Sequence, residues 1–217
     1  MDAPFDLPVR LPIALRSPVE DAIARAVDGR WAERLWSRDT TLWSDDAHVQ
    51  ERIAQRLGWL DAPEAFAERT AELTAFGEAA AGEGFGRAVV CGMGGSSLAP
   101  EVLARSFPVS QRGMAVSVLD STDPEAVRRA TQEAGAETGL FLIASKSGTT
   151  TETLAFLAHL WEETEETHGR APRSRAGEHF VAITDAGKSL EAIPHADDFR
   201  SVFLNPTDVG GRYSALT

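Results

Sequence analysis

The pattern of hydrophobic and polar positions changes character along the chain. From Pro18 onward, apolar residues recur at the spacing of one helix face, and residues 45–57 and 63–80 repeat this helical pattern. Three glycines then interrupt the pattern, at Gly82, Gly84 and Gly86. We therefore expect residues 1–85 to form a helical N-terminal segment and residues 86–217 to form a separate domain.

After residue 86, short apolar runs alternate with helical patterns. The runs are rich in Val, Ile and Leu, as buried strands are, and they occupy residues 87–93, 115–120, 140–145, 179–185 and 200–205. Strands that alternate with helices favour a parallel sheet that is covered on both faces and connected by right-handed crossovers. We therefore predict an α/β fold: a three-layer αβα sandwich with a five-stranded parallel sheet, preceded by the helical segment.

Polar and glycine-rich segments follow each of these runs. They read GMGGSS, DSTD, SKSGTTT, TDAGKS and NPTDVGGR. In sheets of this kind, ligands bind beyond the carboxyl ends of the strands. The coincidence of position and composition therefore predicts a ligand site at that edge of the sheet.

The segment SKSGTTTET joins the third expected strand to a helix. Unpaired backbone N–H groups and the positive end of the helix dipole converge at such a junction. Lys146 adds a positive charge. This charge can stabilise either a bound phosphate or the negative charge that develops at the reacting carbon atoms. A helix cap needs only one or two hydroxyl groups, whereas this segment offers those of Ser145, Ser147, Thr149 and Thr150. We therefore predict that the segment binds phosphate.

Two other glycine-rich turns can bring the backbone close to a ligand. Gly94 and Gly95 lie in the first turn, where Ser96 adds a hydroxyl group at a helix start. Gly211 lies in the second turn, where Arg212 either points a rigid cation into the same cleft or is a solvated side chain on a tight turn. A nucleotide-binding domain is disfavoured, because GMGGSS lacks GxGxxG spacing and no GxxxxGK[ST] segment is present.

Composition narrows the possible partners and location. The net charge of −12 argues against binding to nucleic acid or to acidic membranes, and no apolar stretch is long enough to span a bilayer. Cys91, the single cysteine, lies in an apolar run, so we expect a buried, inert thiol. The start of the chain lacks the pattern of a signal peptide, so we expect a cytoplasmic protein. The histidines lack metal-ligand spacing, so we expect no metal and no cofactor.

Three motifs, GMGGSSLAP, SKSGTTTET and DVGGRYSALT, occur in the order and on the elements that are typical of one family. Over residues 86–217 the chain resembles the glucose-6-phosphate isomerase family, and specifically the first of that family's two sugar isomerase (SIS) domains. The Trp-rich stretch RLWSRDTTLW, with RLGWL, is also similar to the isomerase half of bifunctional transaldolase/phosphoglucose isomerase proteins.

The resemblance implies an aldose–ketose isomerase of glycolysis and gluconeogenesis that interconverts glucose 6-phosphate and fructose 6-phosphate. The family works without a metal, by moving a proton between C1 and C2 through a cis-enediol, and it suggests a homodimer. Its phosphate loop matches Ser145, Lys146, Ser147 and Thr150, its sugar-side loop matches Gly94, Gly95 and Ser96, and its enediolate-stabilising segment matches Gly211 and Arg212. The chain departs from the family pattern at Ser147, Gly148, Ser97 and Ala99, which leaves the fit to mannose 6-phosphate open.

In the family, the glutamate base, a ring-opening histidine and a late lysine lie well beyond the VGGRYS segment, inside which this chain stops at Thr217. We therefore expect the 217-residue chain to bind sugar phosphates weakly without turning them over. The alternative is a stand-alone SIS domain that senses sugar phosphates, although a sensor has no need for a catalytic-type arginine such as Arg212.

Overall fold

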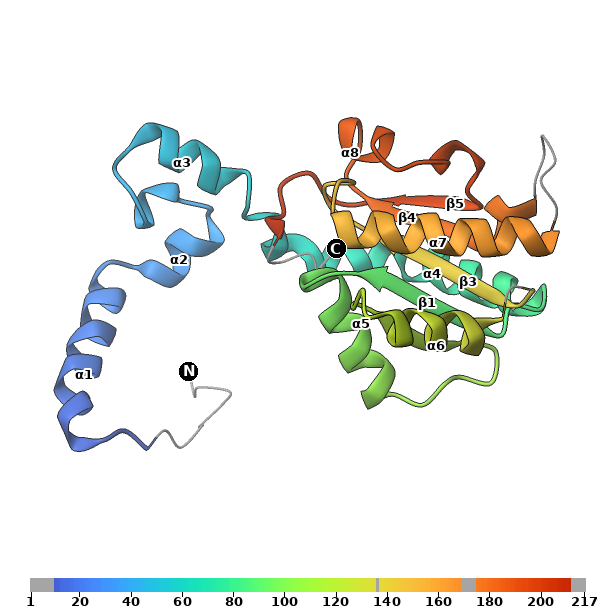
Figure 1. Cartoon of the computed structure of the whole chain (residues 1–217). Coiled ribbons are helices and arrows are strands. Elements are labelled where there is room, and N and C mark those ends of the chain that lie inside the picture. Colours follow the sequence, from blue (N-terminus) through green and yellow to red (C-terminus); the bar gives the residue numbers. More distant parts are fainter. Residues whose placement is uncertain (1–9, 136, 169–174, 212–217) are drawn as a thin grey trace. The chain divides into compact units, whose positions relative to one another are not determined.

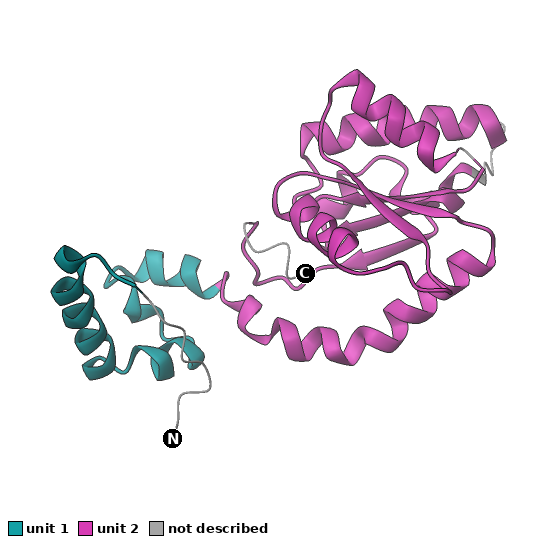
Figure 2. Cartoon of the chain, turned by 90° about the horizontal axis from the view of Figure 1, so that it is seen from below, with its two compact units in different colours: residues 1–54 teal, residues 55–217 magenta. Residues whose placement is uncertain are grey.

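The structure of the chain, a computed structural model, describes residues 10–135, 137–168 and 175–211 (Figure 1). Contacts between residues divide it into two units (Figure 2), which we call the N-terminal unit, residues 1–54, and the sheet unit, residues 55–217. Among the described residues, no helix combines the length and the apolarity that crossing a membrane requires.

The N-terminal unit consists of short helices joined by tight turns. Its elements are α1 (Ile13–Asp28), α2 (Trp31–Trp36), the 3-10 helix η1 (Thr40–Leu42) and α3 (Ala47–Ala54). The carboxylate of Asp39 accepts hydrogen bonds from the backbone N–H of Thr41, 2.9 Å, from its hydroxyl, 2.6 Å, and from Nε of Arg34, 2.7 Å. These bonds lower the pKa of Asp39 to about 2. None of the described residues of this unit is buried, so local polar contacts define its turns.

The sheet unit is built on five parallel strands in the order β2-β1-β3-β4-β5. They are β1 (Arg87–Gly92), β2 (Ala115–Leu119), β3 (Gly139–Ala144), β4 (Phe180–Thr184) and β5 (Ser201–Leu204). The ends of each strand differ by at most one residue from those of the predicted apolar run. The predicted five-stranded parallel sheet is confirmed. The chain moves outward from β1 to β2 and then returns to the other side of β1, so the direction of winding reverses between β1 and β3.

Helices cover both faces of this sheet (Figure 1). On one face, Phe141 and Phe180 pack with Phe156 and Trp161 of α7. On the other face, Ala80 of α4 packs against Leu140 and Val181. The helices are α4 (Ala62–Gly82), α5 (Gly95–Ser106), α6 (Pro124–Ala134), α7 (Thr151–His168) and α8 (Lys188–Glu191), with 3-10 turns η2 (Gly58–Asp61), η3 (Arg175–His179) and η4 (Ala196–Asp198).

Contacts between residues place the boundary between the two units after Ala54. The sequence pattern had placed it 31 residues later, before residue 86. The reason is helix α4, which belongs to the helical part of the sequence but packs on the sheet. Its Phe76 meets Phe203 of β5 edge to face, with ring centroids 5.1 Å apart. Packing therefore joins α4 to the sheet unit, although its sequence pattern resembles that of the preceding helices.

The beginning and the end of the sheet unit are joined by backbone pairing. Leu57 forms an isolated antiparallel bridge with Val209, and both side chains are buried. The N–H of Gly58 donates to the carbonyl of Asp208 at 2.9 Å. A Cβ atom on Gly58 would lie 2.0 Å from Oδ1 of Asp208, so a larger residue at position 58 would require this side chain to move. The bridge therefore holds the beginning of the sheet unit beside the segment that follows β5.

Candidate functional site

The predicted site residues follow β1 and β3, the two neighbouring strands between which the winding reverses. In open α/β sheets, such a reversal separates the loops beyond the carboxyl ends and leaves a crevice for a ligand. The turn after β1 leads into α5, and the loop after β3 leads into α7. The fold therefore brings the two motifs GMGGSS and SKSGTT to the same edge of the sheet.

The loop between β3 and α7 has a fixed backbone. The N–H of Ser145 donates to the carbonyl of Ile183 at 3.0 Å, and the N–H of Gly148 donates to the carbonyl of Ser145 at 3.1 Å. Gly148 has a φ of 68°, and a Cβ atom there would lie 1.8 Å from the carbonyl oxygen of Ser189. Only glycine fits this position, because both the backbone conformation and the neighbouring chain exclude a side chain.

The hydroxyl groups of this loop lie in two hydrogen-bonded pairs. The hydroxyl of Ser145 donates to that of Thr150 at 3.2 Å, and the hydroxyl of Thr149 donates to that of Ser147 at 3.0 Å. Ser145 is buried, whereas Ser147 and Thr149 are exposed. The four hydroxyl groups thus gather at the start of α7, where the helix dipole favours an anion.

The turn after β1 lines a cavity next to the loop after β3. Gly94 has a φ of 59°, and α5 begins at Gly95. Ser96 and Gly95 line a cavity of about 230 Å³ together with Lys146 and Asn205, which come from the loops after β3 and β5. The structure therefore brings residues of both predicted loops around one cavity.

Lys146 lies in an ion pair that the sequence did not indicate. Its Nζ donates to Oδ2 of Asp185 at 2.5 Å, and Oδ1 of Asp185 accepts from Nδ2 of Asn205 at 3.1 Å. Asp185 and Asn205 were not among the predicted site residues, but each directly follows a strand, in the segments TDAGKS and NPTD. This position could have identified them from the sequence, since polar residues at strand ends meet at one edge of a parallel sheet.

The remaining predicted residues are less well placed by the structure. Gly211 is exposed at the end of the described part of the sheet unit, and Arg212 lies outside the described residues. Their contribution to the site stays a prediction. Cys91 is buried in β1 as expected, and burial raises the pKa of its thiol to about 12, which disfavours the reactive thiolate.

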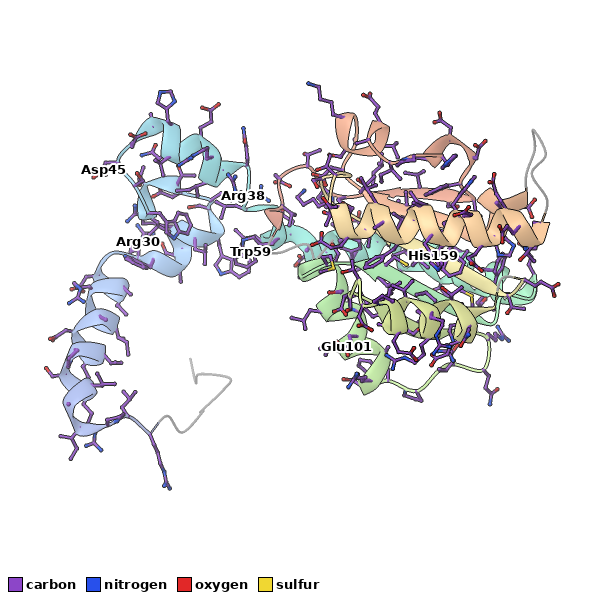
Figure 3. All side chains as sticks on the ribbon, in the orientation of Figure 1. Arg30, Arg38, Asp45, Trp59, Glu101 and His159 are labelled. Atoms are coloured by element: carbon purple, nitrogen blue, oxygen red, sulfur yellow. The ribbon has the colours of Figure 1, made fainter. Side chains whose placement is uncertain are left out.

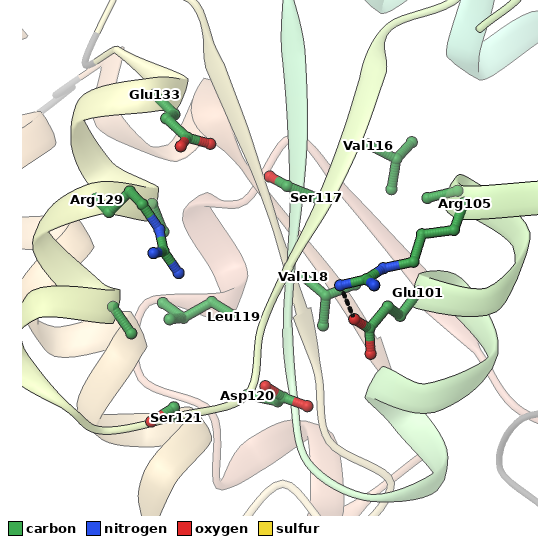
Figure 4. A pocket seen from close by; sticks show the side chains of 13 residues that line it. Glu101, Arg105, Val116, Ser117, Val118, Leu119, Asp120, Ser121, Arg129 and Glu133 are labelled. Carbon is green, nitrogen blue, oxygen red and sulfur yellow. Dashed lines mark ion pairs between the residues drawn. The ribbon is translucent and has the colours of Figure 1, made fainter. Parts of the chain in front are cut away.

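Other cavities are formed by residues outside the predicted set. One of about 360 Å³ follows the edge strand β2 between α5 and α6, where Glu101 pairs with Arg105 and Arg129 faces the strand from the other side (Figure 4). Another lies between α6 and α7 and includes His159, which projects from α7 (Figure 3). Among the described residues, no group of His, Cys, Asp and Glu is arranged to hold a metal ion.

Comparison with known proteins identifies the family. The family model described as phosphoglucose isomerase matches residues 27–217. A curated glucose-6-phosphate isomerase from Thermus thermophilus is 34% identical over 163 residues, which cover 74% of this chain and 37% of that protein. The glucose-6-phosphate isomerase from Desulfitobacterium hafniense is 30% identical over 198 residues, 90% of this chain and 35% of that protein.

Solved structures are also similar to this chain. A hypothetical protein, also from Thermus thermophilus, has a TM-score of 0.66 and 27% identity, and the match covers 96% of this chain and 46% of that one. A glucose-6-phosphate isomerase from Chlamydia trachomatis has a TM-score of 0.54 and 26% identity, with 83% and 32% covered. The chain spans little more than a third of the length of the curated relatives. On these matches, the chain belongs to the phosphoglucose isomerase family.

Proposed function

We propose that this chain supplies the phosphate-binding part of a glucose-6-phosphate isomerase. The observation that carries the proposal is the loop after β3, where four hydroxyl groups gather at the N-terminus of an 18-residue helix. An anion there accepts hydrogen bonds from hydroxyl and backbone donors, and the helix dipole favours its charge. The relatives that carry the name glucose-6-phosphate isomerase support a sugar phosphate as that anion.

The cavity beside the loop supports a role for the turn after β1. Gly95 and Ser96 lie on its wall with Lys146 and Asn205, and the rest of the wall is apolar. A ligand whose phosphate occupies the loop would therefore lie beside the turn after β1. In this proposal Ser145, Ser147, Thr149 and Thr150 hold the phosphate, and Gly94, Gly95 and Ser96 face the sugar. Lys146, Gly211 and Arg212 stabilise the negative charge that develops on the substrate during isomerisation.

The proposal also covers what this chain does by itself. We expect the 217-residue chain to bind sugar phosphates without isomerising them, since it matches 37% or less of the curated relatives cited above. We further propose a cytoplasmic location, a homodimeric full-length enzyme, and no binding to nucleic acid or membranes. The net charge of −12 and the single cysteine support the location and the excluded partners.

Isothermal titration calorimetry with 6-phosphogluconate tests the phosphate assignment. The chain is expected to bind it, and the double variant Ser145→Ala/Thr150→Ala should bind about 100-fold more weakly, because two hydrogen bonds to a charged group are lost. Thr167→Ala is the matched control, since its hydroxyl donates to the carbonyl of Glu163 at the far end of α7. Unchanged binding in the double variant would remove the phosphate assignment.

A coupled isomerase assay tests the second part of the proposal. The purified 217-residue chain is expected to show no turnover of glucose 6-phosphate or fructose 6-phosphate above a blank without protein. Measurable isomerisation by the pure chain would show that its own residues include a proton-transferring group, and this part of the proposal would fail.

A further inference from the structure

The ion pair between Lys146 and Asp185 joins two loops whose residues are 39 positions apart in the sequence. The nitrogen and oxygen atoms are 2.5 Å apart, and the two side chains are only 19% and 25% exposed. A fully exposed ion pair contributes little, because water screens the charges and the side chains lose entropy. Partial burial reduces this screening, so the pair can fix where the ammonium group lies.

Backbone hydrogen bonds hold the two loops in place around this pair. The N–H of Asp185 donates to the carbonyl of Lys146 at 3.2 Å, and the hydroxyl of Thr184 lies 3.5 Å from the same carbonyl. The two residues are thus tied by main chain and side chain at once. The carboxylate is therefore not free to move with the lysine as a mobile surface pair would.

Asn205 fixes the other oxygen of the carboxylate. Its Nδ2 donates to Oδ1 of Asp185 at 3.1 Å, and its own N–H donates to the carbonyl of Thr184 at 2.9 Å. Asn205 is only 9% exposed. The loops after β3, β4 and β5 therefore form one hydrogen-bonded chain that ends on the ammonium group.

Lys146 also borders the turn after β1. Lys146 and Asn205 line the cavity that includes Gly95 and Ser96. The hydroxyl groups of the phosphate loop bond to one another, Ser145 to Thr150 and Thr149 to Ser147, whereas the ammonium group of Lys146 bonds to Asp185. Lys146 is thus shared with the cavity beside the turn after β1, which we assign to the sugar.

We propose that Asp185, oriented by Asn205, is a positioning residue that holds the ammonium group of Lys146 against the sugar part of the ligand and not against its phosphate. An ammonium group has three N–H donors, so it can keep Asp185 and still bind ligand oxygens. This inference rests on the proposed function, because it assigns a role within the same site.

The choice of lysine fits this role. Of the 21 Lys and Arg residues in the chain, only Lys146 and Lys188 are lysine. A guanidinium group tends to form a planar, bidentate pair with a carboxylate, whereas an ammonium group is a compact charge with donors in three directions. A lysine at this position can therefore face a carboxylate and a ligand together.

Calorimetry with two ligands tests the proposal. 6-Phosphogluconate carries a carboxylate at the sugar end, whereas inorganic phosphate has no sugar end. Asp185→Asn and Lys146→Met should each weaken 6-phosphogluconate binding about tenfold, as should the double variant, because both changes remove one interaction. Binding of inorganic phosphate should change by less than about twofold in all three. Asp198→Asn, which changes an exposed carboxylate on η4, is the matched control and should bind both ligands as the unchanged chain does.

Several outcomes would overturn the proposal. Losses that add in the double variant would mean that Asp185 acts independently of Lys146. An equal loss of inorganic phosphate binding would place the ammonium group at the phosphate. Unchanged binding of 6-phosphogluconate in either single variant would remove the role of the pair altogether.

Competitive acetylation with acetic anhydride, followed by peptide mass spectrometry, tests the pair without any ligand. Lys188 is exposed and serves as the internal reference. Lys146 should react about tenfold more slowly than Lys188 in the unchanged chain, and within about twofold of it in Asp185→Asn. The same ratio in both proteins would refute the positioning role. If the unchanged chain binds neither ligand, the proposed function fails, and this measurement still decides the pairing of Lys146.

Discussion

The N-terminal unit and the sheet unit both contain amphipathic helices, but only the sheet unit buries them. On α1, Ile13 is 83% exposed and Val27 is 69% exposed, whereas Phe156 and Leu160 of α7 are almost fully buried. An apolar stripe specifies a helix, but a partner surface is needed to stabilise it. The comparison shows that the pattern alone does not tell which helices carry the stability of the fold.

The polar contacts of the two units differ in the same way. Asp39 is held by Arg34 and Thr41, which are 5 and 2 positions away. In the sheet unit, Nδ1–H of His179 donates to the carbonyl of Gly139, 40 positions away, and Arg200 donates to Glu83, 117 positions away. Arg200 thereby keeps the pKa of Glu83 below its ordinary value. In the sheet unit, contacts between residues far apart in the sequence hold strand starts and helix ends together. In the N-terminal unit, the contacts around Asp39 are local and shape only a turn.

Truncation of a core aromatic residue should show the largest difference between the units. Phe180 is fully buried and packs against the rings of Phe141 and Trp161. Phe180→Ala should lower the free energy of unfolding by about 3–5 kcal/mol. Trp36→Ala, at a position 66% exposed in the N-terminal unit, should lower it by less than about 0.5 kcal/mol. Urea unfolding of both variants measures this, and equal losses would contradict the comparison.

A substitution in the phosphate loop should have the next largest effect. Gly148→Ala adds a Cβ atom that meets the carbonyl of Ser189, so it should lower the free energy of unfolding by about 2–3 kcal/mol and weaken ligand binding. Gly77→Ala is the control, because Gly77 lies within α4 and a Cβ atom there meets open space. It should leave the stability unchanged or raise it by up to about 1 kcal/mol, since alanine favours a helix over glycine. If Gly148→Ala loses no more stability than Gly77→Ala, position 148 does not require glycine.

The smallest expected effect concerns pH. Burial lowers the pKa of His179 from its ordinary value of 6.5, and the charges of His168 and Arg200 act in the same direction. The hydrogen bond to Gly139 and the charge of Glu178 oppose this shift without cancelling it. The unfolded chain therefore takes up a proton first as the pH falls, so the contribution of His179 is present above about pH 6.5 and is lost below it. His179→Asn keeps a donor for the carbonyl of Gly139 but does not titrate.

Thermal unfolding followed by circular dichroism at about pH 7.5 and about pH 5.5 checks this expectation. The unchanged chain should lose about 2 °C more in Tm between these pH values than His179→Asn does. An identical pH dependence in both proteins would show that His179 titrates alike in the folded and unfolded states.

Much of the fold could be predicted from the sequence, because the sheet produces a strong local pattern. The runs at residues 140–145 and 179–185 differ from β3 and β4 by only a residue or so at each end. The helical pattern at 45–57 was longer than α3, since residues 55 and 56 form a turn and Leu57 pairs with Val209. Local patterns therefore find elements more reliably than they find their ends.

The site was predictable only in part. The hydroxyl groups of the phosphate loop are neighbours in sequence, so Ser145 and Thr150 could be grouped from the motif alone. The link from Lys146 to Asp185 and Asn205 depends on the adjacency of β3, β4 and β5, which no local pattern records. A polar residue after a strand signals the edge of the sheet, but the strand order decides which side chains meet there.

The bridge between Leu57 and Val209 has a mechanical consequence. Tension applied between the residues before Leu57 and the residues after Val209 pulls directly on this pairing, because the bridge joins the two segments. The bridge and the hydrogen bond from Gly58 to Asp208 therefore take up such tension before it reaches the parallel strands.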